Sequence, residues 1–243
     1  KYFDKAYSGW WNKIDTADFN NDRRPDLVIG NMGTNTQCKA TDQEPAEIYF
    51  KDFDDNGSVD PFFCFYIQGK SFPYVTRDEL LEQIGSLRPR FNSYKSYADI
   101  TLKDIFKPEA LSSAGHLQAN HLETTLFMRS PDGKFNVAPL PVQAQYSPVH
   151  TITIVDYDHD GKKDVLLCGN NNHARLRLGK FDANYGILLK GNNRGSFQYI
   201  DQSKSGFRLR GDVRSVIELN ETLIFGIGEQ SIAAYKPSKQ AAQ

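Results

Sequence analysis

Residues 152–167 read ITIV-DYDHDGKKD-VLL: an apolar run, nine residues from Asp156 to Asp164 that include four aspartates, and a second apolar run. Both apolar runs are short and rich in β-branched or aliphatic residues, which favours strands over helices. Gly161 stands at the sixth position of the loop, where a sharp turn favours a residue that tolerates positive φ. The stretch therefore predicts a strand, a tight acidic loop and a second strand.

The same layout occurs twice more in the chain. Residues 14–30 read IDTA-DFNNDRRPD-LVIG, and residues 47–63 read EIYFK-DFDDNGSVD-PFF. Hairpin signals around Gly133 and Gly195 follow the second and third loops, so that loop, strand and hairpin give about four strands per module. An internal repeat of this kind indicates a propeller, a solenoid or an array, and four strands are the content of one propeller blade.

Three modules depart from the pattern. Residues 213–226 form a fourth module with strand-prone runs but no acidic loop, and the first module is too short for a complete blade. The second module is longer than the third by 42 residues between its loop and its hairpin glycine. There the capping box Thr76–Glu79 and apolar residues at helical spacing predict helices. We therefore expect an all-β fold: a partial β-propeller domain over residues 1–243, with a helical insertion at about 76–119.

The acidic loops suit a hard cation. Calcium takes six to eight oxygen ligands at about 2.3–2.6 Å. Side-chain oxygens at loop positions 1, 3, 5 and 9, with a backbone carbonyl at position 7, supply most of them. The candidate ligands are Asp18, Asn20, Asp22, Arg24 and Asp26 in the first loop; Asp52, Asp54, Asn56, Ser58 and Asp60 in the second; and Asp156, Asp158, Asp160, Lys162 and Asp164 in the third.

One hydrated acidic turn can arise by chance, whereas three in the same strand–loop–strand setting indicate metal. We expect two to three Ca²⁺ sites. The first is expected to be the weakest or most distorted, because Arg23 stands where Gly57 and Gly161 stand in the others. An EF-hand is excluded, because its position 12 needs Glu and flanking helices, and Ile29 and its counterparts lie in strands instead.

The pattern D-x-[DN]-x-[DN]-x-x-x-D between two strands resembles the FG-GAP/VCBS repeat of integrin α-subunit propellers and many bacterial surface proteins. The segments 30–35 and 180–186, with the helical insertion, are similar to the C-terminal region of Bacteroidetes VCBS-repeat proteins related to cartilage acidic protein. The resemblance implies structural calcium, a cell-surface, periplasmic or secreted location, and binding or cell adhesion rather than catalysis. Arg23 and the missing fourth loop depart from the family pattern.

The charge and hydropathy of the sequence argue against two kinds of partner, nucleic acid and the interior of a membrane. The net charge of -1 gives no global attraction to nucleic acid, and no apolar run reaches the roughly 20 residues of a membrane span. Cys64 and Cys168 lie in apolar runs and are expected to be buried. The five histidines show no zinc spacing.

The chain starts at Lys1 with no leader, so we expect a segment of a longer protein whose remaining blades, or a second copy, cover its open flank.

The sequence favours a non-enzymatic binding module for a protein or glycan. The alternative is a glycan-active lyase or glycosidase on a propeller scaffold, which would need acids outside the calcium loops. Two features bear on the ligand. Trp10-Trp11 either packs in the core, as we expect, or forms a platform on which a sugar stacks. The amide-rich and basic loop 170–177 is either a ligand face or a hydrated loop.

Overall fold

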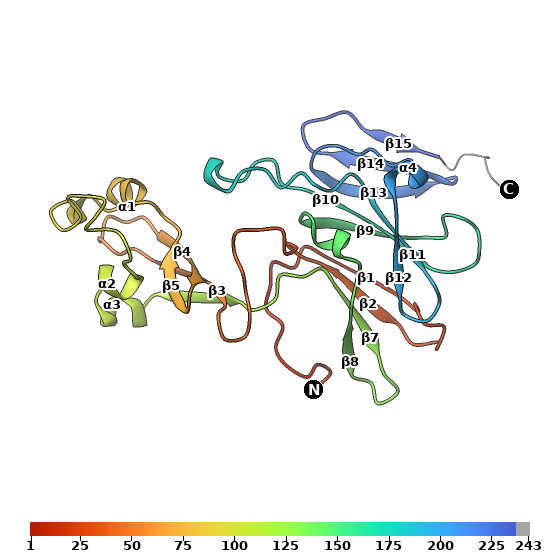
Figure 1. The fold of residues 1–243 in the computed structure, drawn as a ribbon, viewed down its shortest axis with the longest axis horizontal. Coiled ribbons are helices and arrows are strands. Elements are labelled where there is room, and N and C mark those ends of the chain that lie inside the picture. The colour runs from red at the N-terminus through yellow and green to blue at the C-terminus, as the bar shows by residue number, and fades with distance from the viewer. Residues whose placement is uncertain (237–243) are drawn as a thin grey trace. The chain divides into compact units, whose positions relative to one another are not determined.

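The computed structural model describes residues 1–236, and its described part contains four antiparallel sheets (Figure 1). Strands make up 35% of the chain and helices 13%, so the predicted all-β class is confirmed. The chain divides into two compact units. Unit 1 comprises Lys1–Ala6, Trp10–Gln37 and the chain from Leu122 onward; unit 2 comprises Tyr7–Gly9 and Cys38–His121.

The first sheet of unit 1 joins two pieces of chain that are far apart in sequence. Strands β1 (Lys13–Ala17) and β2 (Asp26–Gly30) form a hairpin around the first acidic loop. Strand β2 then pairs with β7 (Thr125–Arg129), and β7 pairs with β8 (Phe135–Ala138), so the order is β1-β2-β7-β8 (Figure 1).

This pairing corrects the predicted modules. The hairpin around Gly133 does not belong to the second module but completes the sheet of the first loop. The first module is therefore not short, because unit 2 is inserted between its second and third strands. Sequence spacing assigned the hairpin to the nearest preceding loop, and its apolar alternation fits either sheet.

The second and third sheets of unit 1 follow the chain in order. The second is a meander of β9 (Val149–Val155), β10 (Asp164–Gly169), β11 (Ile187–Gly191) and β12 (Phe197–Ile200). The third contains β13 (Val213–Leu219), β14 (Thr222–Ile227) and β15 (Ala233–Tyr235). The predicted hairpin around Gly195 is confirmed as β11–β12, and the strand-prone runs of the fourth module form β13 and β14, whose turn carries no acidic loop. Short helices η2 (Val142–Gln145), η3 (Leu176–Leu178) and α4 (Gln202–Ser205) lie in the connections.

The second sheet lies between two cores, which explains the unbroken apolar run of β10. Successive strand residues point to opposite faces. Val165 and Leu167 pack in the cluster that includes Val28 of the first sheet, and Leu166 and Cys168 pack in the cluster that includes Phe225 of the third. Every residue of β10 is buried as a result. The three sheets of unit 1 thus pack face to face in series.

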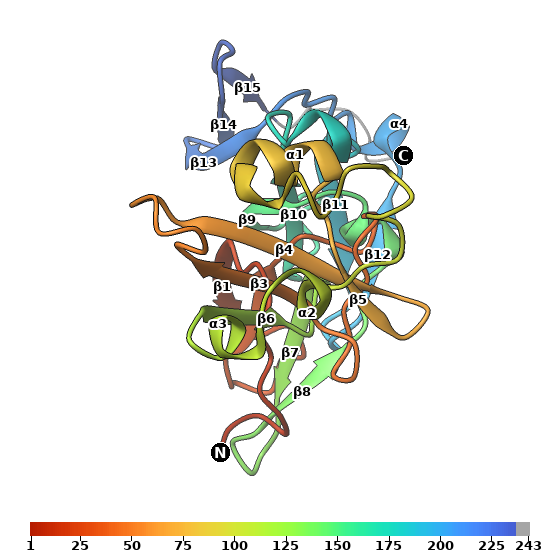
Figure 2. The ribbon, with the colours of Figure 1, turned by 90° about the vertical axis from the view of Figure 1, so that its left-hand side faces the viewer.

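Unit 2 has one sheet with helices against one face of it (Figure 2). Its strands are β3 (Ala46–Lys51), β4 (Asp60–Ile67), β5 (Lys70–Pro73) and β6 (Gly115–Ala119), in the order β5-β4-β3-β6. Its helices are α1 (Arg77–Gln83), η1 (Gly85–Leu87), α2 (Leu102–Ile105) and α3 (Pro108–Ser112). Phe62 and Cys64 of β4 form a core with Leu80, Leu81 and other apolar residues of the helical segment.

The predicted helical segment is found between Thr76 and Ser112, and α1 has the predicted capping box of Thr76 and Glu79. Its last part is not helical. Residues 115–119 form β6, which pairs with β3 and belongs to the strand ladder. The predicted bound of the helical insertion, about residue 119, is therefore wrong, because the last helix ends at Ser112 and β6 extends the sheet of unit 2 beside β3. No helix in the described part of the chain has the length and hydropathy to cross a membrane.

Candidate metal centre

The three acidic loops occupy one structural position. Each connects the first and second strands of a sheet: β1 to β2, β3 to β4, and β9 to β10. They share a backbone conformation, with positive φ at positions 4 and 6. The φ values at position 4 are 61° for Asn21, 56° for Asp55 and 58° for His159, and those at position 6 are 67° for Arg23, 88° for Gly57 and 77° for Gly161. Arg23 therefore adopts the left-handed conformation expected of glycine, and the first loop is not distorted at this position.

The aspartate at position 1 holds the turn of its loop. In the second loop Asp52 Oδ1 accepts from Asn56 N at 3.0 Å, and Oδ2 accepts from Gly57 N at 2.7 Å. In the first loop Asp18 accepts from the equivalent amides, those of Asp22 and Arg23. The N–H of Gly57 is the main cause that lowers the pKa of the Asp52 carboxyl. Position 1 thus organises the backbone whether or not it also binds a cation.

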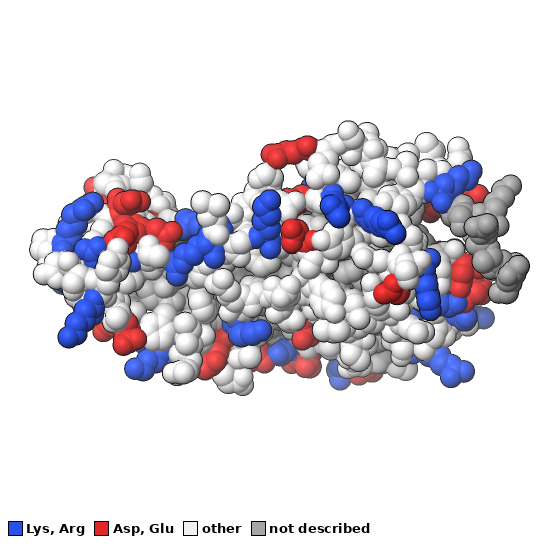
Figure 3. Space-filling view, turned by 45° about the horizontal axis from the view of Figure 1, so that its top comes forward, with Lys and Arg blue, Asp and Glu red and all other residues white. Residues whose placement is uncertain are grey.

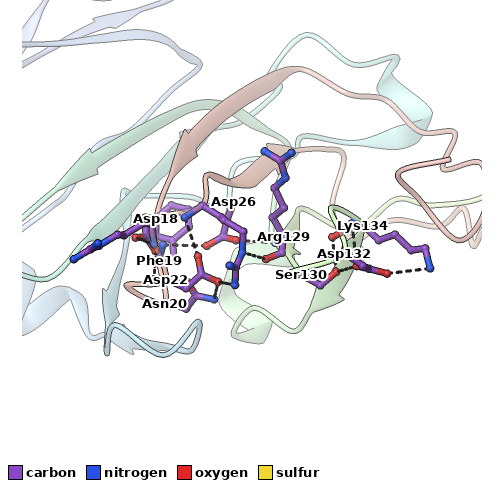
Figure 4. Close-up of polar contacts among 11 residues, drawn as sticks. Asp18, Phe19, Asn20, Asp22, Asp26, Arg129, Ser130, Asp132 and Lys134 are labelled. Carbon is purple, nitrogen blue, oxygen red and sulfur yellow. Dashed lines mark hydrogen bonds and ion pairs between the residues drawn. The ribbon is translucent and has the colours of Figure 1, made fainter.

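The aspartate at position 9 ties its loop to the neighbouring strand, and both examples in unit 1 are fully buried. One oxygen accepts from the backbone N–H at loop position 2, and the other accepts from a backbone N–H of the third strand of the sheet (Figure 4). Burial raises the pKa of both carboxyls. The contacts are Asp26 to Phe19 N at 3.0 Å and Arg129 N at 2.7 Å, and Asp164 to Tyr157 N at 3.1 Å and Gly191 N at 2.8 Å.

In unit 2 a helix supplies the second contact. Asp60 Oδ2 accepts from Phe53 N at 2.9 Å, as in the other loops. Its Oδ1 accepts from the side chain of Gln83, the last residue of α1, at 3.0 Å. Gln83 therefore takes the place of the third-strand amide. The sequence predicted the helix but contained no signal for this contact, because Gln83 lies 23 residues from Asp60.

The second loop is the most negative of the three, with Asp52, Asp54, Asp55 and Asp60 and no basic residue. Oxygens of Asp52, Asp54 and Asp60 lie within 4.8 Å of one another. Asp54 Oδ1 is buried and has no hydrogen-bond partner. These three carboxylates can hold a metal ion, whereas the amide oxygen of Asn56, at position 5, accepts from Ser58 N at 2.8 Å.

The third loop has the same three carboxylate positions but contains lysines. Oxygens of Asp156, Asp158 and Asp164 lie within 4.8 Å of one another, and Asp156 Oδ1 is buried without a partner. Asp160, at position 5, accepts from Lys162 Nζ at 2.7 Å instead of joining this group. Lys162, followed by Lys190 of β11, lowers the pKa of the Asp160 carboxyl to about 2.

The first loop has an internal cation. Asn20 stands at position 3, so only Asp18 and Asp26 supply carboxylates at positions 1, 3 and 9. Arg24 Nη2 contacts Asp22 Oδ2 at 2.6 Å, and Asn20 Nδ2 donates to the same oxygen at 2.8 Å (Figure 4). Desolvation raises the pKa of Asp22, but the N–H of Arg24, the amide of Asn20 and the guanidinium together lower it. The predicted ligands of this loop are largely engaged with one another.

Arg24 also connects the loop to the adjacent hairpin. Its Nε donates to the carbonyl of Arg129 at 3.4 Å, and the turn that follows is closed by Asp132 (Figure 4). Asp132 Oδ1 accepts from Ser130 Oγ at 2.5 Å, and Asp132 Oδ2 lies 3.0 Å from Lys134 Nζ. The Ser130 hydroxyl, with Lys134, lowers the pKa of Asp132 to about 2. The first loop is thus part of a closed network of protein groups.

The other candidate ligand features have mostly structural surroundings. Asn170, the first residue of loop 170–177, is buried and donates to the carbonyls of Asn184 and Gly211. Leu176, by contrast, is fully exposed. Trp10 is 40% exposed, so it is not the core residue that we expected. On the face shown in Figure 3, basic and acidic side chains are interspersed and neither sign forms a continuous patch.

Comparisons with known proteins identify no relative. No protein-family model matches the chain, and searches of curated proteins and of solved structures found no match either. The resemblance to FG-GAP/VCBS repeats therefore depends on the residues of the loops and stays a prediction.

Proposed function

We propose that this chain is a calcium-binding part of a β-propeller of the FG-GAP/VCBS type, acting as a binding or adhesion module for a protein or glycan. One observation supports the proposal that a metal ion binds: Asp54 Oδ1 and Asp156 Oδ1 are buried and no donor contacts them. Leaving a buried charged oxygen unpaired costs free energy. Each of these oxygens lies in a loop where three carboxylates converge, so a bound cation removes that cost.

The ligand chemistry favours calcium over other metals. The second and third loops supply only oxygen donors at the converging positions, which suits hard cations and not zinc or copper. Magnesium demands near-ideal octahedral geometry, whereas calcium accepts an irregular set of carboxylates, carbonyls and water. The mixed oxygen donors of each nine-residue loop form an irregular set of this kind. The remaining ligands would be the carbonyls of Ser58 and Lys162 and solvent.

The arrangement of strands supports the propeller part of the proposal. The first two sheets of unit 1 each have four antiparallel strands in chain order from one edge to the other, as a propeller blade does. Successive sheets share an apolar core. Unit 2 would then be a domain inserted into the first blade. A calcium-supported module of this kind belongs in a cell-envelope or secreted setting, where calcium is at millimolar concentration.

An exposed apolar face supports the proposal that further blades, or a second copy, complete the assembly. Ile217 and Leu219 lie on one face of β13 and are 59% and 57% exposed, while Val216 packs inward. Ile217 and Leu219 thus lie on the face of the third sheet opposite to the core that it shares with the second sheet. Exposed apolar faces of this type favour association.

Calorimetric titration with Ca²⁺ tests the metal, and a binding screen tests the module. We expect binding that Asp54→Asn and Asp156→Asn each reduce by one site. The absence of binding in the wild type would sink the proposal. A glycan and protein array, read with calcium and with EDTA, should then show a ligand whose signal needs calcium.

A glycan-active enzyme is the second candidate, and one cluster favours it. Glu47 of β3 is 6% exposed and accepts from His116 Nε2 at 3.1 Å, with Gln118, Ser71 and Tyr49 also donating to it. This buried acid is outside the calcium loops. If the chain cleaves a glycan, Glu47→Gln should abolish the cleavage and leave Ca²⁺ binding unchanged.

A further inference from the structure

Lys190 is not part of any acidic loop, yet it reaches into the third. It lies in β11, and its Nζ contacts Asp158 Oδ2 and lies 3.0 Å from Asp160 Oδ2. Both residues are candidate ligands, at positions 3 and 5. The side chains of Lys190 and Asp158 are each 30% exposed, so the pair is partly shielded from solvent.

The first sheet shows what the same position contains when no lysine is there. Arg129 N and Gly191 N donate to the position-9 aspartates of their loops, so these two residues are equivalent. The residues that precede them are therefore equivalent as well: Met128 in the first sheet and Lys190 in the second. Met128 packs against the apolar cluster of unit 1. The ammonium group is thus absent from the equivalent position of the first sheet and is not a requirement of the fold.

We propose that Lys190 is the counter-ion of Asp158 in the third loop and that a divalent cation must displace it in order to bind there. The inference rests on the proposed calcium function. A cation coordinated by Asp158 would place a double positive charge beside the ammonium group, and the two repel each other. Lys190 therefore sets a lower affinity at the third loop than at the second, whose aspartates form no ion pair in the described part of the chain.

The test isolates the third loop by measuring Ca²⁺ binding in an Asp54→Asn background. Lys190→Met, which installs the residue of the first sheet, should tighten binding roughly fivefold, in line with the loss of exposed ion pairs. Lys190→Arg keeps the charge and should leave the affinity near that of the background. Lys163→Met removes a lysine of the same loop that forms no ion pair with its carboxylates in the described structure.

The outcomes separate the two proposals. Tighter binding in Lys190→Met but not in Lys163→Met supports the counter-ion. Equal tightening in both variants overturns it, because net charge alone then explains the result. Less than twofold tightening in Lys190→Met also overturns it, because the ammonium group then does not oppose the cation. If the third loop binds no calcium in any variant while the second loop of the wild type does, the inference fails and the calcium function survives. If neither loop binds calcium, the proposed function fails first.

Discussion

The first and second acidic loops have the same backbone and balance their charge in opposite ways. Both have positive φ at positions 4 and 6, and both use the position-1 aspartate to accept from two loop amides. The first loop then adds Arg24, which pairs with Asp22, whereas the second leaves Asp54 Oδ1 buried without a partner. The two loops thus share the hydrogen bonds of the turn and differ in their charges, so we expect the second loop, and not the first, to hold a metal ion.

The largest expected effect tests the shared part of the comparison. Asp26→Ala and Asp60→Ala each leave two donors without their acceptor, so each should lower the free energy of unfolding by about 3 kcal/mol. Denaturant unfolding in EDTA measures this loss. Asp15→Ala, which removes a partly exposed carboxylate of β1, is the control and should change little. A loss of stability seen only with calcium present would mean that position 9 acts through the metal and not through hydrogen bonds.

A double substitution can bring the charges of the first loop closer to those of the second. The double variant Asn20→Asp, Arg24→Gln gives the first loop a third carboxylate and removes its internal cation. We expect one additional Ca²⁺ per chain, and at 1 mM calcium a Kd near 10⁻⁴ M corresponds to about 1.4 kcal/mol of added stability. Arg23→Gln, which keeps the Arg24–Asp22 pair, serves as the control. An unchanged number of bound ions would contradict the idea that Asn20 and Arg24 keep calcium out of the first loop.

A smaller effect tests the backbone. Gly57 has φ 88° and open space where a Cβ would lie, so Gly57→Ala should cost about 1 kcal/mol from backbone strain alone. Gly85 also has open space but no positive φ, and Gly85→Ala should be neutral or stabilising. Arg23→Gly should relieve the equivalent strain in the first loop. Equal effects of the two alanine substitutions on thermal unfolding would contradict the assigned loop conformation.

The smallest effect is in proton binding. In EDTA, carboxyl ¹³C NMR should find the Asp26 pKa above 3.8, because the carboxyl is buried, and the Asp52 pKa below 3.8, because Gly57 N–H donates to it. The folded state therefore favours the ionised form of Asp52. Its contribution to stability is complete above the unfolded pKa and is lost as the pH falls through the folded pKa. Asp26 has the opposite sign, since the folded state takes up its proton at a higher pH than the unfolded state. A reversed order of the two pKa values would contradict the hydrogen bonds described.

The sequence was sufficient to predict the acidic loops but not the strands and side chains that contact them. Alternating apolar residues and a nine-residue acidic motif are local signals, so strand, loop and strand were predicted correctly three times. The pairing of β2 with β7 was missed, because nothing local in Thr125–Arg129 indicates a partner strand that precedes the whole of Cys38–His121 in the sequence.

The side chains that contact the candidate site from other elements were missed in a similar way. Gln83 and Lys190 reach the loops from a helix and from a neighbouring strand, and no spacing rule connects them to Asp60 or Asp158. Arg24 was visible in the sequence, but as a carbonyl ligand. Its side-chain pairing with Asp22 depends on a rotamer that only the fold selects. Motif positions therefore predict which atoms are present, and the tertiary structure decides which of them are available.

The most direct test of the central claim is an anomalous-scattering experiment on crystals grown with millimolar calcium. The charges predict one calcium peak among Asp52, Asp54 and Asp60 and a second among Asp156, Asp158 and Asp164, with Lys190 turned away from the second. They predict no peak between Asp18 and Asp26, where Arg24 should keep its contact with Asp22. A calcium peak in the first loop, or none in the second, would contradict the account.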